Sequence, residues 1–280
     1  MKSNNLAAIA GPAQSPAEHY QAADSAAAPV VSIVCPTYQR PAFLRQQVEN
    51  YCAQTFGGGL EMLILDDSPE PSVFLDAPFC RQHAVTYIHR PAERLTIGTK
   101  LNLLMSAAQG DIIMRFDDDD YYAPTYVERM LEFLGDADFF TLSRWFAYSY
   151  LKRKFCYWAT DRMSSTHFVL SPWDPFQAVS TEGWDSSFVD GTLWGYGFST
   201  VWRRSIYPHV EFTDMDHGED LNFYRKVAAA GYKTTCAPDT EGLALHLVHN
   251  GNISRMFPQY VLPDFMVHKY FPIYARTAGL

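Results

Sequence analysis

The sequence predicts an α/β protein with a mostly parallel central sheet flanked by helices. Two observations favour this class. In the first 140 residues, short apolar runs alternate with stretches of helical character, as strands and helices do in proteins with parallel sheets. Two of the apolar runs end in carboxylates, at Asp66-Asp67 and at Asp117 to Asp120. Open α/β sheets bind their ligands at the carboxyl ends of their strands, so these acids mark a candidate site.

Each element of the first half has a local signal. The first strand stops at Pro36, and Pro41 suits the first turn of a helix, where its missing N–H is not needed. Three glycines at 57–59 separate that helix from the second strand. In chain order we expect a strand at 30–35, a helix at 41–54, strands at 61–65 and 84–89, a helix at 98–109 and a strand at 111–116.

The pattern changes in the second half. Residues 141–200 are crowded with Trp, Tyr and Phe, show no clear period, and predict a second lobe or a cover over the sheet edge. The other expected elements are a helix from 125 to 134, a stretch at 139–150, regular structure at 198–204, a helix at 218–230, a strand at 233–237 and a short irregular aromatic tail at 258–280.

Composition narrows the class of protein. With 280 residues and 48% hydrophobic content, the chain can bury one large core or a core with a smaller lobe. Its net charge of -9, without a basic block, argues against nucleic acid as the main partner. Its five cysteines are scattered singly, which favours a reducing compartment over disulfides or a zinc site. No apolar stretch approaches the ~18 residues that span a bilayer, so we expect a soluble, cytoplasmic protein and leave peripheral membrane association open.

The run from Asp117 to Asp120 is the strongest functional signal. Adjacent carboxylates repel one another, and a fold that holds them together usually neutralises them with Mg²⁺ or Mn²⁺, which prefer oxygen ligands. A solvated acidic loop is the simpler alternative. We favour the metal site because a buried strand delivers the run to a sheet edge, where a parallel strand also brings Asp66-Asp67. The pair suits hydrogen bonds to a base and ribose, and the run suits a metal that bridges two phosphates.

Other candidate residues are ambiguous on their own. Glu219-Asp220 begins a helix, where the helix dipole stabilises acids, and a carboxylate held there is also well placed to act as a general base. His246 and His249 lie next to a turn and are either structural or ligands. The basic residues nearest the predicted crevice, which would pair with a diphosphate or remain surface charges, are Arg40, Arg94 and Lys100.

Taken together, these motifs resemble glycosyltransferases of the GT-A fold, family 2 type, over residues 30 to about 255. The six matching elements are the strand and Pro-Thr-Tyr turn at 31–40, Gln-Thr-Phe at 54–56 before the Asp-Asp strand end at 66–67, Gly98 with Lys100 and Asn102, the DxD segment at 117–119, Gly-Glu-Asp-Leu at 218–221, and His-Asn-Gly-Asn-Ile-Ser at 249–254. In the last element an extra Asn follows His249, which makes His246 the alternative ligand.

The resemblance implies a reaction and its participants. The enzyme would move a sugar from a nucleoside-diphosphate sugar, most often a UDP-sugar, to a hydroxyl of a carbohydrate, lipid-linked or small-molecule acceptor, with inversion. Mn²⁺ or Mg²⁺ would be the cofactor. Asp220 would be the general base, Asp119 and His249 would hold the metal with Asp117 nearby, and Asp120 would be structural. The implied donor-binding residues are Pro36, Thr37, Tyr38, Arg40, Asp67, Lys100, Asp117 and Asp118.

The resemblance also implies how the chain is divided. Residues 29–140 would form the nucleotide-sugar-binding half, residues 141–255 the acceptor-binding and catalytic half of the same domain, and residues 256–280 a C-terminal tail. Residues 1–28, rich in Ala, Ser, Gln and Pro, resemble neither a signal peptide nor a membrane anchor and would be a loose tail. The aromatics that would stack on acceptor sugars, or else belong to the core, are Trp184, Trp194 and Tyr196.

Two other classes of protein remain as alternatives. A nucleotidyltransferase that makes nucleotide sugars (a sugar pyrophosphorylase) also places metal-binding acids on a nucleotide-binding sheet. It needs a glycine- and lysine-rich phosphate loop after its first strand, and Pro36 to Gln39 is not such a loop. A catalytically inactive carbohydrate-binding relative would have lost Asp220 or the acids at 117–119, and both are present.

Overall fold

The computed structural model describes residues 31–252 and 254–280 and confirms the α/β class. The tail expected at residues 1–28 lies outside the described residues. The elements of the first half are β1 (Val31–Thr37), α1 (Pro41–Cys52), β2 (Leu60–Asp66), α2 (Ala77–Gln82), β3 (Val85–His89), α3 (Ile97–Ala107) and β4 (Ile112–Arg115). Of these, only the short helix α2 was not predicted.

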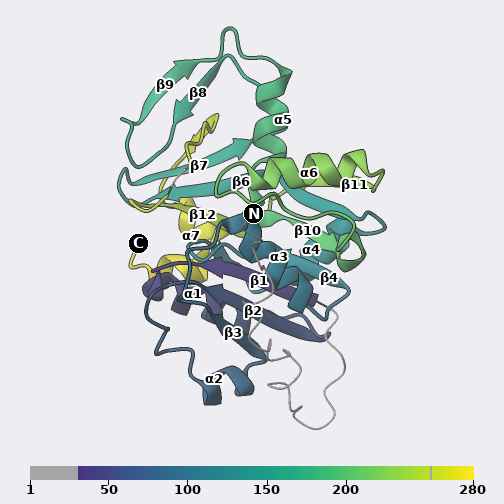
Figure 1. The fold of residues 1–280 in the computed structure, drawn as a ribbon. Helices are drawn as coiled ribbons and strands as arrows, with labels where there is room; N and C mark the ends of the chain where they lie inside the picture. Colours follow the sequence, from purple (N-terminus) through teal and green to yellow (C-terminus); the bar gives the residue numbers. More distant parts are fainter. Residues whose placement is uncertain (1–30, 253) are drawn as a thin grey trace, which may run out of the picture.

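The first four strands form a parallel sheet in the order β4-β1-β2-β3, covered on both faces. All seven residues of β1 are buried, as its continuous apolar run predicts. Successive side chains point to opposite faces, so Ile33 packs in the same cluster as Leu44 of α1, whereas Val34 packs with Leu101 of α3. The helices α1 and α3 therefore fix the sheet from opposite sides (Figure 1).

One continuous sheet runs from the first half into the second. The strand β10 pairs antiparallel with both β4 and β6 and so joins the two halves. The sheet continues β10-β6-β7-β13, and β11 and β12 lie parallel to β6. The elements of the second half are β5 (Tyr121–Tyr122), α4 (Tyr126–Leu134), β6 (Phe139–Ser149), β7 (Lys154–Ala159), β8 (Thr166–Val169), β9 (Gln177–Ser180), α5 (Ser186–Trp194), η2 (Gly197–Ser199), β10 (Val201–Arg203), η3 (Arg204–Ile206), α6 (Glu219–Ala229), β11 (Thr234–Pro238), β12 (Ala244–Val248), β13 (Tyr260–Leu262), α7 (Met266–Tyr270) and α8 (Pro272–Thr277).

The aromatic region at 141–200 is more regular than its sequence indicates. Most of β6, and all of β7, extend the main sheet, whereas β8 and β9 form a separate two-stranded sheet next to α5. Figure 1 shows β8, β9 and α5 standing above the main sheet, on the side away from α2. A second lobe or cover was expected here, and these three elements form it.

The expectation of an irregular tail at 258–280 is wrong. Residues 260–262 add the edge strand β13, and α7 and α8 pack on the sheet through Val267, Phe271 and Tyr274, which are at most 2% exposed. The prolines of this segment conceal its pattern in the sequence, because Pro272 begins α8 instead of breaking it.

Candidate active site

The ends of β1, β2 and β4 bring the predicted acids to one edge of the sheet. Thr37 lies beside Asp66, and Val34 lies beside Arg115, so the loops after all three strands meet. A cavity of about 920 Å³ opens at this edge. Among the predicted residues, those that line it are Pro36, Thr37, Tyr38, Arg40, Arg94, Lys100, Asp117, Asp118, Asp119, Tyr196, Glu219, Asp220 and His246. Asp67 and His249 lie directly behind this lining, in contact with Lys100 and Asp119 respectively.

A buried ion pair supports one end of the cavity. Lys100 is 2% exposed and its Nζ contacts Asp67, which is 3% exposed. The Nζ also donates to the Thr37 carbonyl at 2.8 Å, and Asp67 accepts from the Leu95 amide at 2.6 Å. Burial raises the pKa of Asp67, but the hydrogen bonds from Lys100 and Leu95 lower it by a larger amount, so the pKa of Asp67 ends below its usual value. The guanidinium of Arg94 lies 4.3 Å from the centre of the Tyr38 ring, so these two side chains pack against each other at this end of the cavity.

We expect Lys100→Met to destabilise the protein by about 3–5 kcal/mol, because it leaves the Asp67 carboxylate buried without its cation. Urea unfolding followed by circular dichroism measures the change. The double variant Lys100→Met/Asp67→Asn should recover part of the loss, since the remaining group is neutral. A single variant as stable as the wild type would show that the pair is not a buried support.

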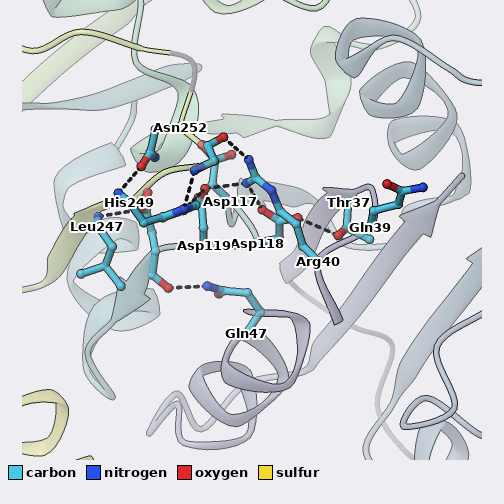
Figure 2. A network of polar contacts seen from close by, with 12 residues as sticks. Thr37, Gln39, Arg40, Gln47, Asp117, Asp118, Asp119, Leu247, His249 and Asn252 are labelled. Atoms are coloured by element: carbon cyan, nitrogen blue, oxygen red, sulfur yellow. Dashed lines mark hydrogen bonds and ion pairs between the residues drawn. The ribbon is translucent and has the colours of Figure 1, made fainter. Parts of the chain in front are cut away.

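The four aspartates of the run have different partners. Asp117 accepts from Arg115 Nε at 2.6 Å, and Asp118 accepts from Thr37 Oγ1 at 2.6 Å and from Arg40 Nη1 at 2.8 Å. Asp119 Oδ2 lies 2.5 Å from the same Arg40 nitrogen. Figure 2 shows Arg40 reaching the run from one side and His249 from the other. The guanidinium groups of Arg40 and Arg115 therefore offset part of the repulsion between the carboxylates.

The last aspartate of the run is structural in its contacts. Asp120 is fully buried, accepts from the Leu247 amide at 2.9 Å through Oδ1, and lies 2.8 Å from His246 Nδ1 through Oδ2. These contacts hold the end of the acidic run against β12. The sequence motif alone does not distinguish it from its three neighbours.

The two histidines differ in how well their nitrogens suit a metal ion. The Gly251 amide donates to His249 Nδ1 at 3.0 Å, so a neutral His249 carries its proton on Nε2 and donates it to Asp119, 3.0 Å away. His246 is the reverse case, because Nδ1 faces the Asp120 carboxylate and Nε2 is buried with no hydrogen-bond partner among the described residues. Burial lowers the pKa of His246, but Asp120, Asp119 and Asp117 raise it by more, to about 9, so Nε2 carries a proton when no metal is bound. A carboxylate on one ring nitrogen is the usual second partner of a histidine ligand, and a divalent cation bound by Asp119 and Nε2 would replace that proton.

The protein supplies few ligands for that cation. Within residues 31–252 and 254–280, no group of three or more His, Cys, Asp or Glu side chains is arranged to hold a metal. A shortage of protein ligands is expected for Mg²⁺ or Mn²⁺ at a phosphate site, where waters and phosphate oxygens complete the shell.

Asp220 lies across the cavity at the start of α6. Its Oδ2 accepts from the Gly197 amide at 3.0 Å, and its Oδ1 contacts Arg115 Nη1. The side chain is 13% exposed, so a ligand in the cavity can reach it. Burial raises the pKa of Asp220 to about 8, with Glu219 and Asp117 acting in the same direction and Arg115 against them.

Arg115 links the two acidic groups and was missed by the sequence analysis. It is 5% exposed, and its guanidinium contacts Asp117 through Nε and both Asp220 and Glu219 through Nη1. The available signal was an arginine in the last position of an otherwise apolar strand. Burial of such a residue requires partners nearby.

Gly197 is where backbone and side chains approach most closely in this site. A Cβ atom at this position would overlap Arg115 Nη1 and Asp220 Oδ1. We expect Gly197→Ala to displace Asp220 and lower kcat by about 100-fold, since a shift of the order of 1 Å has that effect on an aligned group. Steady-state kinetics measures it. The control is Gly191→Ala, which also lies on the cavity but whose Cβ would meet nothing within 4 Å; equal losses in both variants would contradict this role.

Two of the three aromatic residues expected to stack on sugars lie away from the cavity lining. Trp194 stacks on Tyr224 with centroids 3.8 Å apart, and Trp184 packs against Phe188; neither lines the cavity. Tyr196 does line it, but its hydroxyl donates to the Arg255 carbonyl at 2.8 Å. The exposed aromatic at the cavity is Trp173, 57% exposed, which the sequence analysis did not single out.

The described residues contain no helix with both the length and the apolar character needed to cross a membrane.

This sheet, with acids at its edge and a carboxylate on α6 at the same cavity, has the architecture of the GT-A fold. The sequence profile of the family described as "Glycosyl transferase family 2" matches residues 32–204. The chain therefore belongs to glycosyl transferase family 2.

One curated relative is distant in sequence. The curated protein "Putative glycosyltransferase EpsH" of Bacillus subtilis (strain 168) is 22% identical over 202 residues, which cover 70% of this chain and 54% of that protein. This chain thus spans about half the length of that relative.

Among solved structures, S. aureus TarS 1-349 in complex with UDP-GlcNAc is similar with a TM-score of 0.56 at 14% identity, over 79% of this chain and 59% of that one. The mannosyltransferase PcManGT from Pyrobaculum calidifontis, in complex with GDP-Man and Mn²⁺, is similar with a TM-score of 0.55 at 16% identity, over 85% of this chain and 64% of that one. At these identities the likeness concerns the fold.

Proposed function

We propose that the protein transfers a sugar from a nucleoside-diphosphate sugar to an acceptor hydroxyl, with inversion and with a bound Mn²⁺ or Mg²⁺. The observation that carries the proposal is that Tyr38, the acidic run and Asp220 line one cavity. The likeness to proteins bound to UDP-GlcNAc and to GDP-Man with Mn²⁺ supports a nucleotide-sugar donor. We favour a UDP-sugar among these donors.

The proposed roles follow the position of each residue. The nucleobase of the donor would lie at Tyr38, with Asp67 and Lys100 supporting the loop that carries Tyr38. Asp118 would contact the ribose. Arg40, which contacts both Asp118 and Asp119, would pair with the diphosphate. Pro36, Thr37 and Asp117 complete the donor side. Residues 29–140 would thus bind the donor. Residues 141–255 would provide the acceptor side and the general base, Asp220.

Asp119 would hold the metal together with a histidine. His249 contacts Asp119, and His246 offers Nε2, which has no hydrogen-bond partner among the described residues. A bound Mn²⁺ or Mg²⁺ would offset the negative charge that develops on the departing diphosphate.

Asp220 would act as the general base. The acceptor oxygen bonds to the anomeric carbon as the bond from that carbon to the diphosphate oxygen breaks, and the hydroxyl proton passes to Asp220. Gly197 and Arg115 hold the carboxylate in place from two sides. Because attack occurs on the face opposite the leaving group, the anomeric configuration is inverted.

The test is a product assay. The purified chain with Mn²⁺ is incubated with a panel of UDP-, GDP- and dTDP-sugars and with carbohydrate and lipid-linked acceptors. Release of a nucleoside diphosphate with formation of a glycosylated product is expected for at least one pair. A parallel incubation with nucleoside triphosphates and sugar 1-phosphates tests the alternative class, because a nucleotidyltransferase would release pyrophosphate from that mixture. No turnover of any nucleotide sugar would contradict the proposal.

We expect the rate to rise with pH as Asp220 loses its proton. The base works as the carboxylate, and its raised pKa predicts that kcat increases about tenfold per pH unit below about 8 and levels off above it. Arg115 lowers the pKa of Asp220, so the variant Arg115→Gln should raise that pKa and move the pH at which kcat rises to a higher value. A pH–rate profile measured at saturating donor and metal checks both. A flat profile from about pH 6 to about pH 9 would contradict the assignment.

A further inference from the structure

A second surface of the protein combines cations with exposed apolar side chains. It consists of the turn between β6 and β7 together with the first residue of β7 (150–154), the residues of β13 and the loop after it (260–265), and the outer sides of α7 and α8. We refer to it as the basic–apolar surface. The antiparallel register that places Leu262 beside Phe155 carries the loop after β13 to the β6–β7 turn. Tyr150 in that turn contacts Tyr274 of α8. In Figure 1, α7 and the C-terminus lie at the left of the molecule.

The turn carries three consecutive cations, which is unusual in a chain of net charge -9. They are Lys152, Arg153 and Lys154, and α7 and α8 add Lys269 and Arg276. Within the described part of the chain, none of these five side chains has a carboxylate within 4 Å. The nearest acidic residue of the loop, Asp264, reduces this excess of positive charge by one.

Most of the exposed large hydrophobic side chains belong to this surface. Eight such residues occur in the described chain, and six of them lie here. Phe265 is 72% exposed and Leu151 is 45% exposed, and both occupy the adjoining loops. The other four are Tyr150, Tyr260, Val261 and Ile273. Exposed apolar groups gathered in one region mark an interaction surface.

The basic–apolar surface continues to the mouth of the cavity. Lys154 Nζ lies 5.6 Å from the centre of the Phe176 ring, in the loop before β9. In the same loop Asp174 is paired at 2.8 Å with Arg255, and both Arg255 and Trp173 line the cavity.

We propose that the basic–apolar surface docks on an anionic phospholipid bilayer. The apolar side chains enter the boundary between headgroups and acyl chains, and the lysines and arginines contact lipid phosphates. The arrangement suits a bilayer because the exposed apolar groups lie on a turn, an edge strand and helix ends, with cations interleaved among them. A protein of net charge -9 is otherwise repelled by an anionic surface, so it can approach only through such a region. The mouth of the cavity would then lie near the bilayer, where an acceptor carried on a lipid could enter; this consequence rests on the proposed function.

Flotation with vesicles tests the proposal. The full chain is mixed with phosphatidylcholine vesicles that contain or lack phosphatidylglycerol, without any nucleotide sugar. We expect binding to the anionic vesicles only, and weaker binding as salt is raised. Failure to bind anionic vesicles, or equal binding to both kinds, would overturn the proposal. Because no donor is present, this result is independent of whether the protein transfers sugar.

Matched variants locate the binding surface. Lys152→Glu/Arg153→Glu/Lys154→Glu should weaken vesicle binding on the order of 100-fold, since each cation near an anionic surface contributes roughly fivefold. The control reverses three exposed arginines elsewhere, in Arg81→Glu/Arg204→Glu/Arg225→Glu, and has the same net charge. It should bind more strongly than the turn variant. Equal weakening in both triple variants would overturn the assignment to this surface.

A separate variant tests the apolar contribution. Leu151→Ser/Phe265→Ser leaves every charge in place, and both side chains are exposed, so the fold should be retained. We expect it to bind anionic vesicles at least about tenfold more weakly, because two large apolar side chains no longer enter the interface. Wild-type binding by this variant would overturn the proposed insertion.

Discussion

Asp220→Asn is expected to lower kcat by about 10³-fold while donor binding stays within a factor of a few of the wild type. Asparagine has nearly the shape of aspartate and can still accept from the Gly197 amide, but it cannot take a proton. Asp220 contacts Arg115 and the Gly197 amide, whereas Asp118 and Asp119 are held by Arg40, so neutralising Asp220 should leave these two donor-side acids in place. Single-turnover kinetics and calorimetric titration with the nucleoside diphosphate measure the two effects separately.

The neighbouring carboxylate provides the control. Glu219 is on the same helix turn and lies 3.4 Å from the same Arg115 nitrogen, but it does not contact Gly197. Glu219→Gln should therefore retain most of the activity. Wild-type turnover in Asp220→Asn, or equal losses in the two variants, would show that Asp220 is not the base.

Asp119→Ala is expected to abolish metal-dependent donor binding. Loss of a ligand to Mn²⁺ should weaken nucleoside diphosphate binding by at least about 100-fold when the metal is present, because even residues that only orient a ligand contribute 10- to 100-fold. The variant should fold, since Arg40 keeps its contact with Asp118 at 2.8 Å when Asp119 is absent. Titration with the nucleoside diphosphate, in Mn²⁺ and in EDTA, separates metal-dependent from metal-independent binding.

Asp216→Ala is the matched control, because this carboxylate also lines the cavity but contacts Arg94 and the Ile97 amide instead of Asp119 or a histidine. It should leave the effect of Mn²⁺ unchanged. If Asp119→Ala bound the donor as tightly as the wild type in Mn²⁺, the metal would have to be held elsewhere.

Much of the fold could be predicted because its strongest local patterns agree with the tertiary structure. The runs that form β1, β2 and β4 are buried on both faces, so they are mostly apolar and easily recognised. Their parallel order places their ends together, which is why acids about 50 residues apart could be predicted to share an edge.

Other parts depend on contacts that no local pattern reveals. The link from Arg115 to Asp220 spans 105 residues and is visible only once α6 has packed on the sheet. The contrast between His246 and His249 depends on which hydrogen bond each ring makes, through Asp120 and Gly251. The burial of α7 and α8 likewise comes from packing on β6, β7 and β12, and their prolines hide it.

The most direct test of these assignments is a crystal structure with a nucleoside diphosphate and Mn²⁺ bound. We expect the nucleobase against Tyr38 and the diphosphate beside Arg40. We expect the metal within about 2.3 Å of an Asp119 oxygen and of a nitrogen of His246 or His249. The space for the sugar should then lie between the diphosphate and Asp220. A nucleotide bound outside this cavity, or a metal held without Asp119, would contradict these assignments.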